Sequence, residues 1–301
     1  MSRLTRTKQK ASNQQDVYDH PFFRSLIRRS HRYLSAGYPI HYTGPSGIGK
    51  TTLALHVAKS RNRPVTLING NRDMSNEDLI GAFKGYNRKK LNDNFVKQVH
   101  KVEENVTEDW VEGRLYEAVK NGHTVVYDEF TRSSPDTNNL FLSVIEEKIL
   151  PLYGAKRKQS HIEVHPHFSI IFTSNPSEYV GVYETQDALL DRMISLPFET
   201  IGNETRAEIL MQQTSIGKGE AGKIVDFIGN VNALCREGSQ TVSLRASLMM
   251  ADVIMKNDIP VDGENEEFQQ LALDVCYFHL KLCSEREEDV ESHILNVCKQ
   301  V

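Results

Sequence analysis

The eight residues GPSGIGKT, at positions 44–51, constrain the fold of this chain more than any other segment. They follow a short apolar segment, residues 40–43, that favours a strand, and they precede TTLALHVAKS, which favours a helix. Gly44, Gly47 and Gly49 allow backbone angles that other residues rarely adopt, so several amide N–H groups can point at one anion. A strand, a glycine loop and a helix in this order predict a phosphate-binding loop within an α/β fold.

The residue types of this loop suit a nucleoside triphosphate. The helix after the loop presents its positive end to the anion, Lys50 would reach the β- and γ-phosphates, and Thr51 would offer a hydroxyl to Mg²⁺. We therefore expect ATP and Mg²⁺ as cofactors. The residues expected to bind the nucleotide are Gly44, Pro45, Ser46, Gly47, Ile48, Gly49, Lys50, Thr51 and Thr52. A glycine-rich turn that matches by chance is the alternative.

Four further apolar segments are short and are separated mainly by helical patterns, which predicts a parallel sheet with helices on both faces. These segments are residues 65–68, 124–127, 168–173 and 193–196. Apolar residues at helical spacing also predict helices over residues 22–34 and 135–147.

The second of these segments, TVVYDEF, ends in two acids at the carboxyl edge of the predicted sheet, where ligands of open α/β folds collect. Asp128 could hold Mg²⁺, and Glu129 could polarise the water that attacks the γ-phosphate. A solvated acidic pair at a strand end is the alternative reading of these two residues.

Four other polar residues complete the candidate catalytic set. Asn175 ends the FSIIFTSN segment and could hydrogen-bond the attacking water and the γ-phosphate, unless it is only a turn former before a proline. Arg192 could stabilise transition-state charge in a neighbouring subunit's site, with Arg132 as a second candidate for that role, and Arg245 could contact the γ-phosphate in its own subunit. Ion pairing on a helix surface is the alternative for Arg192 and Arg245.

The chain also contains segments that interrupt or follow the strand–helix alternation. We expect a disordered basic tail over residues 1–19 and a β-hairpin at about 149–164. An insertion at about 84–112 holds six bases and one acid up to Lys101, then five acids and no base. The spacing of Phe95, Val99, Val102 and Val106 predicts that it is helical, and the helix either packs on its own domain or protrudes to contact a partner. From residue 202 to residue 301, four helical segments separated by glycine or proline predict a second, helical domain after an α/β domain of residues 20–201.

Composition limits the function classes. The formal net charge is −4, from 36 bases and 40 acids, and the basic segment at residues 88–90 is short, so we expect no nucleic-acid partner. No apolar run approaches the roughly 20 residues that span a bilayer, and the N-terminus lacks the apolar core of a secretory signal. The four cysteines, Cys235, Cys276, Cys283 and Cys298, form no CxxC pair, and we expect free thiols in a reducing cytoplasm.

The order of GPSGIGKT, TVVYDEF, TSN, ALLDRM and SLRA over residues 20–260 resembles the AAA+ ATPases. The insertion before TVVYDEF and the hairpin before Asn175 look like the MoxR branch of that family. Within it, VYDEFTRSSPDTNNLFLSVIEEKILPL and IFTSNPSEYVGVYETQDALLDRMI are very similar to the gas vesicle protein N family, whose relatives include activators of rubisco and of nitric-oxide reductase.

This resemblance implies a P-loop α/β fold with a five-stranded parallel sheet of order 5-1-4-3-2, followed by a smaller helical lid. It implies an ATPase that forms a homo-oligomeric ring, expected to be a hexamer. It also implies chaperone-like remodelling in gas vesicle assembly, with shell or accessory proteins as partners and a cytoplasmic location at the vesicles. Two alternatives remain open. One is an activator that remodels an enzyme complex or inserts its metal, and the other is a structural component that binds ATP without hydrolysing it.

Overall fold

The computed structural model describes residue 18 and residues 20–90, 104–152, 159–175, 183, 187–198, 201–236, 242–283 and 289–301. Five strands form one sheet in the order β2-β5-β8-β1-β9, and β2–β5, β5–β8 and β1–β9 pair in parallel. Numbered along the chain, these strands read 5-1-4-3-2 from one edge, so the predicted fold class and strand order are confirmed. The strands are β1 (Ile40–Thr43), β2 (Val65–Asn69), β5 (Thr124–Asp128), β8 (Ser169–Ser174) and β9 (Ile194–Pro197).

The strands form where they were predicted because their residues are apolar or β-branched and lie between turn formers. Four of the five residues of β5 are buried, and all six residues of β8 are buried, as expected for strands covered on both faces. The predicted helices are confirmed as α2 (Pro21–Ser35) and α6 (Pro135–Leu142), the second continuing as a π-helical turn, Ser143–Glu147. Pro135 opens α6 after Ser134, whose hydroxyl accepts from the Thr137 amide as an N-cap.

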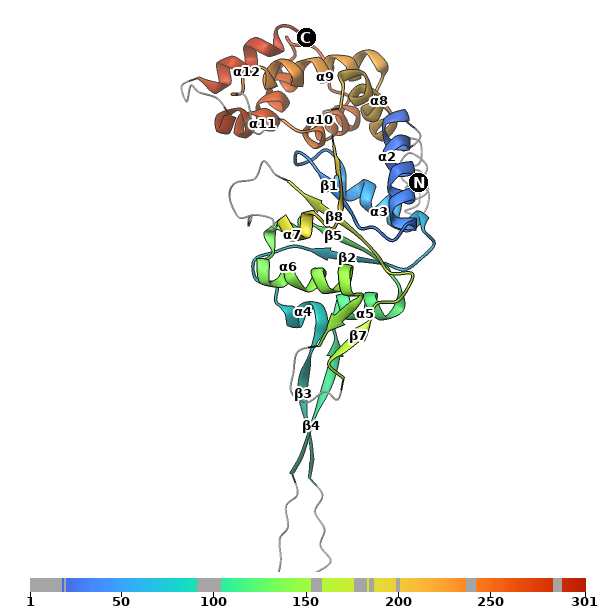
Figure 1. Cartoon of the computed structure of the whole chain (residues 1–301). Helices are drawn as coiled ribbons and strands as arrows, with labels where there is room; N and C mark the ends of the chain where they lie inside the picture. The colour runs from blue at the N-terminus through green and yellow to red at the C-terminus, as the bar shows by residue number, and fades with distance from the viewer. Residues whose placement is uncertain are drawn as a thin grey trace, which may run out of the picture. The chain divides into compact units, whose positions relative to one another are not determined.

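The remaining helices connect the strands or follow the sheet in sequence (Figure 1). Those between strands are α3 (Lys50–Ser60), α4 (Asn76–Ile80), α5 (Arg114–Asn121) and α7 (Asp187–Leu190). Those after β9 are α8 (Asn203–Thr214), α9 (Lys218–Asn232), α10 (Leu244–Asn257), α11 (Glu266–Cys283) and α12 (Val290–Cys298). Within the described ranges, every helix falls short of the length or the hydropathy that crossing a lipid bilayer demands.

The chain divides into two compact units. One comprises residues 1–57, 173–180 and 194–301, and the other comprises residues 58–172 and 181–193. The second unit has a core of buried aliphatic and aromatic residues in which Tyr127, Phe141 and Phe172 pack at ring-centroid distances of 4.9–5.9 Å. The domain boundary predicted at residue 201 does not coincide with this division. That residues 202–301 form a separate helical domain therefore stays a prediction.

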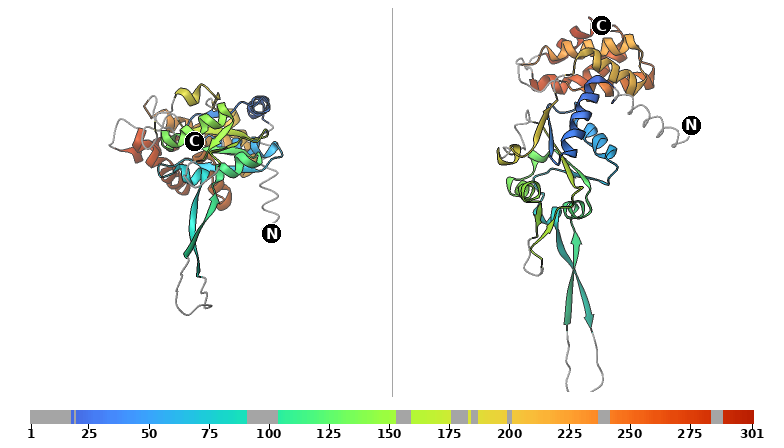
Figure 2. Two further views of the ribbon diagram at one scale, coloured as in Figure 1. Left: turned by 60° about the horizontal axis from the view of Figure 1, so that its bottom comes forward. Right: turned by 45° about the vertical axis from the view of Figure 1, so that its right-hand side comes forward.

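The predicted helical insertion at about 84–112 is wrong. Its described parts are two long strands, β3 (Gly81–Lys90) and β4 (Glu104–Glu112), which pair antiparallel and extend beyond α4 and α5 (Figures 1 and 2). The register pairs Lys84 with Asp109 and Lys90 with Glu104, so the basic segment runs opposite the acidic one. The helical interpretation overlooked that the basic and the acidic segments could form the two strands of one antiparallel pair. Phe95, Val99 and Val102, on which it partly rested, lie outside the described residues.

Two other predictions for segments along the chain can be compared with the structure. The hairpin expected at about 149–164 is present as β6 (Ile149–Pro151) paired antiparallel with β7 (His161–Glu163). Of the predicted disordered tail, only Tyr18 is described. Its side chain is buried, with its ring centroid 3.9 Å from that of His56, so at this residue the prediction of disorder is wrong.

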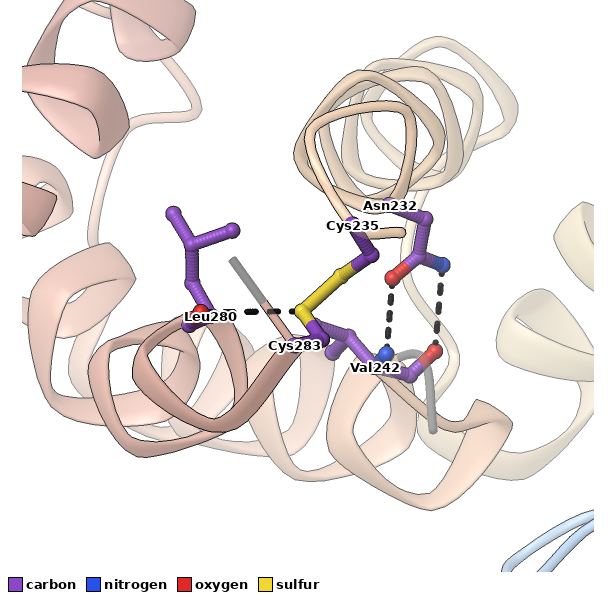
Figure 3. The surroundings of a disulfide bond; sticks show 5 residues. All are labelled: Asn232, Cys235, Val242, Leu280 and Cys283. Atoms are coloured by element: carbon purple, nitrogen blue, oxygen red, sulfur yellow. Dashed lines mark hydrogen bonds between the residues drawn. A yellow bond between two sulfur atoms is a disulfide. The ribbon is translucent and has the colours of Figure 1, made fainter. Parts of the chain in front are cut away.

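The expectation of four free thiols is also wrong. Cys235, just after α9, and Cys283, at the end of α11, form a disulfide across a sequence separation of 48 residues (Figure 3). The Asn232 side chain lies beside it and both accepts from the Val242 amide (2.7 Å) and donates to the Val242 carbonyl (3.2 Å). Cys276 and Cys298 are buried free thiols. The pairing depends on how the helices pack, so cysteine spacing alone carried no signal for it.

Candidate active site

The phosphate loop connects β1 to α3 and has the backbone that its glycines predicted. Gly47 has φ 71°, and a Cβ atom there would lie 2.6 Å from Ser243 Oγ, so only glycine fits for both reasons. Lys50 is 8% exposed, and its Nζ donates to the Gly44 carbonyl (2.8 Å) and to the Pro45 carbonyl (2.6 Å). The ammonium group therefore lies against the loop that it is expected to serve.

The chemistry at the start of α3 suits an anion. The helix begins at Lys50, and its first turn contains no acidic residue. The first amide groups of a helix generally lack an acceptor within the helix, and the helix dipole favours negative charge at that end. Ile48 is buried and anchors the loop, whereas Thr51 is half-buried and Thr52 is exposed. A glycine-lined loop, a buried lysine and an acid-free helix start fit a triphosphate.

The structure brings Arg245 to the same loop. Ser243 caps α10 by accepting from the Ala246 amide, and Arg245 follows in the first turn. The Arg245 Cβ would lie 3.4 Å from a Cβ on Gly47, although 198 residues separate the two positions in sequence. Ser243 was not predicted as a site residue. The sequence signal for it is that Ser243, the first residue of SLRA, is of a type that caps helices.

The acidic pair lies at the end of β5, where contacts with Gly70 constrain its backbone. Asp128 is the last residue of the strand, and its carbonyl accepts from the Gly70 amide at 2.8 Å. Glu129 has left-handed backbone angles, φ 50° and ψ 43°, which are uncommon for a residue with a side chain. A Cβ on Gly70 would lie 2.2 Å from the Glu129 carbonyl oxygen, so residue 70 must be glycine for the backbones to approach this closely.

The turn after the acidic pair is held by a buried asparagine that sequence analysis missed. Residues Phe130–Arg132 form a 3-10 turn. Asn138, on α6, donates to the Phe130 carbonyl (3.2 Å) and the Ser133 carbonyl (3.4 Å), and it accepts from the Tyr127 hydroxyl (3.1 Å). Burial raises the pKa of Tyr127 to about 12, so this hydroxyl keeps its proton at neutral pH.

Glu129 does not have a free carboxylate. Arg132 Nε lies 2.7 Å from Glu129 Oε2, and the two side chains are 39% and 44% exposed. Arg132, the second candidate for a finger, is thus engaged by the proposed water-orienting residue of its own chain.

Asn175 is 6% exposed and directly follows β8. Its neighbour Ser174 is buried and belongs to a polar row that crosses strands, in which His41 is also buried and Ser195 is exposed. His41, on β1, has its Nε2 2.8 Å from Ser174 Oγ and its Nδ1 3.1 Å from Ser195 Oγ. A histidine in an apolar strand gave no sequence signal for this role, because only the register of β1 between β8 and β9 creates it.

Arg192 has an ionic partner in its own chain. Its Nε donates to Glu146 Oε2 and its Nη1 to the Ala188 carbonyl, both at 2.7 Å. The hydrogen bond and the charge of Arg192 lower the pKa of Glu146. The side chain remains 33% exposed, and its role as a finger stays a prediction.

The sheet order relates these segments to one another. The phosphate loop follows β1, Asn175 follows β8 and the acidic pair follows β5, and these three strands are neighbours in the order β5-β8-β1. Ligands of parallel α/β sheets bind beyond the carboxyl ends of such strands.

This strand order, the phosphate loop after β1 and the acidic pair after β5 define an ATPase of the AAA class. The family model for the AAA domain of the dynein-related subfamily matches residues 42–193, half of the chain. Gas vesicle ATPase GvpN of Ancylobacter aquaticus is 41% identical over 251 residues, which cover 83% of this chain and 70% of that protein. The chain belongs to the GvpN family of AAA ATPases.

Two other relatives extend the comparison. Gas vesicle ATPase GvpN2 of Halobacterium salinarum is 38% identical over 264 residues, which cover 88% of this chain and 74% of that protein. Protein CbbQ of Hydrogenophilus thermoluteolus is 23% identical over 254 residues, which cover 83% of this chain and 87% of that protein. The similarity to CbbQ agrees with the MoxR branch that the sequence resembles.

Proposed function

We propose that this protein hydrolyses ATP in order to remodel a protein partner during gas vesicle assembly. The observation that carries the proposal is the identity of about 40% with relatives named gas vesicle ATPases, in a chain that retains the phosphate loop and the acidic pair. The proposed partners are shell or accessory proteins of the vesicle, and the proposed location is the cytoplasm at the vesicle surface.

The phosphate loop and its neighbours would bind the nucleotide. Loop amides and the Lys50 ammonium bind the phosphates, and Arg245, beside Gly47, contributes charge from the same chain. Thr51 and Asp128 offer a hydroxyl and a carboxylate, which are hard oxygen ligands suited to Mg²⁺. When bound, Mg²⁺ would neutralise phosphate charge.

The remaining residues would act on the attacking water and on the charge that develops. Glu129 orients the water, Asn175 hydrogen-bonds it, and Arg192 of a neighbouring subunit stabilises the transition state. Chemistry of this kind depends on positioning and electrostatics, so small displacements of these groups cost much of the rate. A homo-oligomeric ring, which we propose to be a hexamer, would bring Arg192 to the adjacent site.

Glu129→Gln tests the water-orienting role. The variant should bind ATP as the wild type does and lose turnover by about 100-fold or more, because the amide cannot act as a base. Arg192→Ala should also be inactive alone. Phosphate release from a mixture of the two variants should recover in part, since mixed rings contain sites with an intact Glu129 and a neighbouring Arg192.

Turnover near the wild-type value in Glu129→Gln would contradict the assigned role. No recovery in rings shown by mass to contain both variants would contradict the finger. Proteins that co-purify with ATP-loaded Glu129→Gln distinguish the functions: vesicle proteins support the proposal, whereas subunits of a metabolic enzyme complex favour an activator. An absence of phosphate release from the wild type with its partner present would favour a structural ATP-binding component.

A further inference from the structure

Asn232, the last residue of α9, binds the backbone directly before the start of α10. Its Oδ1 accepts from the Val242 amide at 2.7 Å, and its Nδ2 donates to the Val242 carbonyl at 3.2 Å (Figure 3). One side chain therefore pairs with both backbone groups of a residue that is 1% exposed and lies ten positions away. Because a buried backbone group that loses its partner costs free energy, these bonds constrain where Val242 lies.

The backbone of Asn232 is itself anchored. The Cys235 amide donates to the Asn232 carbonyl at 3.1 Å, so the two residues belong to one turn. The disulfide links Cys235 to Cys283 at the end of α11, and the Arg236 amide donates to the Cys283 carbonyl at 3.0 Å. Asn232 therefore binds Val242 from an end of α9 that is held to another helix.

Val242 is followed directly by the residues that lie against the phosphate loop. Ser243 is the N-cap of α10, and Arg245 lies in the first turn of that helix. A Cβ on Gly47 would lie 2.6 Å from Ser243 Oγ and 3.4 Å from the Arg245 Cβ, and these residues and Asn232 belong to the same compact unit. A displacement of Val242 would therefore move the start of α10 relative to the loop, and Arg245 with it.

We propose that Asn232 is a positioning residue that places Arg245 for contact with the γ-phosphate and thereby sets the preference of the site for ATP over ADP. This inference rests on the proposed role of Arg245. Only ATP can make that contact, because ADP lacks the γ-phosphate. A residue needed only for stability would weaken the binding of both nucleotides alike, so the ratio of the two affinities separates positioning from structural support.

The test is calorimetric titration of the full chain, in the presence of Mg²⁺, with ADP and with the β,γ-imido analogue of ATP, which keeps a γ-phosphate and resists hydrolysis. Asn232→Ala should lower the preference for the ATP analogue by about 3- to 10-fold and change the affinity for ADP by less than about 2-fold, as expected when a hydrogen-bonded group is displaced. Asn232→Asp keeps an acceptor for the Val242 amide, so we expect a smaller loss of preference and a second, milder variant.

Asn230→Ala is the matched control. Asn230 lies on the same helix, is exposed, and donates to Gln300 Oε1 at 3.3 Å, away from Val242 in its hydrogen bonding. This variant should keep the wild-type preference. Combining Asn232→Ala with Arg245→Ala should give the preference of Arg245→Ala alone, because Asn232 acts through Arg245.

Arg245→Ala separates this inference from the function on which it rests. If Arg245→Ala keeps the wild-type preference, the role proposed for Arg245 fails, whatever the Asn232 variants do. If Arg245→Ala lowers the preference by about 10-fold or more, as loss of a bond to a charged group predicts, and both Asn232 variants leave it unchanged, the positioning role alone fails. An equal loss of affinity for both nucleotides, or a further loss of preference in the combined variant, would also overturn the inference.

Discussion

At the scale of single residues, His41 is a buried histidine whose neighbours favour its neutral form. It lies 5% exposed on β1, between Ser174 and Ser195, whose hydroxyls face its two ring nitrogens. Burial, and then the positive charge of Lys50, lower its pKa to about 4. The residue therefore cross-links strands as a neutral group, and Ser174 precedes Asn175 of the candidate site.

The depressed pKa makes folding sensitive to acid. The unfolded chain takes up the His41 proton near pH 6.5 and the folded chain only near pH 4, so between these values the unfolded state binds more protons. Stability should fall as the pH drops from about 6.5 to about 4, by about 3 kcal/mol from this group. His41→Gln, which does not titrate, should lose less stability over that range in urea unfolding at each pH. Identical pH profiles for the two proteins would contradict the assignment.

At the scale of elements, the segment from β5 through the 3-10 turn to α6 works as one support for the acidic pair. The adjacent residues Asn138 and Asn139 illustrate how a helix face decides the role of a side chain. Asn138 is buried and bonds three groups of β5 and the turn, whereas Asn139 is exposed. Sequence cannot separate the two, because either asparagine could have been the one turned toward β5.

Asn138→Ala should therefore destabilise the protein much more than Asn139→Ala. Leaving the Tyr127 hydroxyl and two buried carbonyls without this partner should cost about 2–3 kcal/mol, whereas an exposed substitution changes stability by less than about 0.5 kcal/mol. Urea unfolding of both variants measures the difference. ATP hydrolysis should also fall in Asn138→Ala, since the turn carries Glu129. Equal stability of the two variants would show that the buried network contributes nothing.

At the scale of the whole molecule, the Cys235–Cys283 disulfide links the segment just after α9 to the end of α11, across a sequence separation of 48 residues. A cross-link restricts the unfolded chain more than the folded one, and a closed loop of this length is expected to contribute about 4 kcal/mol by the chain-entropy relation. Disulfides are uncommon in the cytosol because they are readily reduced there. The Cys235–Cys283 bond is therefore expected to persist only under oxidising conditions.

Reduction of the disulfide should lower the free energy of unfolding by about 2–4 kcal/mol. Thermal unfolding with and without dithiothreitol measures the loss. The double variant Cys235→Ser/Cys283→Ser is the matched control and should unfold at the same temperature in both conditions. A wild type insensitive to the reductant, with both thiols shown to be free after treatment, would contradict the prediction.

The sequence by itself determined the positions of the five strands, the phosphate loop and the identity of the acidic pair. The order of the strands in the sheet came from the family resemblance. These features are local or ordered along the chain: GPSGIGKT lies between a strand and a helix, and TVVYDEF ends an apolar run at two acids. Short-range steric rules and hydrophobic periodicity act within such segments, so they can be read without neighbours.

Only the tertiary structure decided the rest. It paired β3 with β4, where the spacing of apolar residues had predicted a helix, and it joined Cys235 to Cys283. It also brought Ser243 and Arg245 to Gly47 and gave Glu129 and Arg192 ionic partners. Except for Glu129 and its near neighbour Arg132, these are contacts between residues distant in sequence. Such contacts form because packing of the strands and helices selects which side chains meet, and that selection is absent from any one segment of the chain.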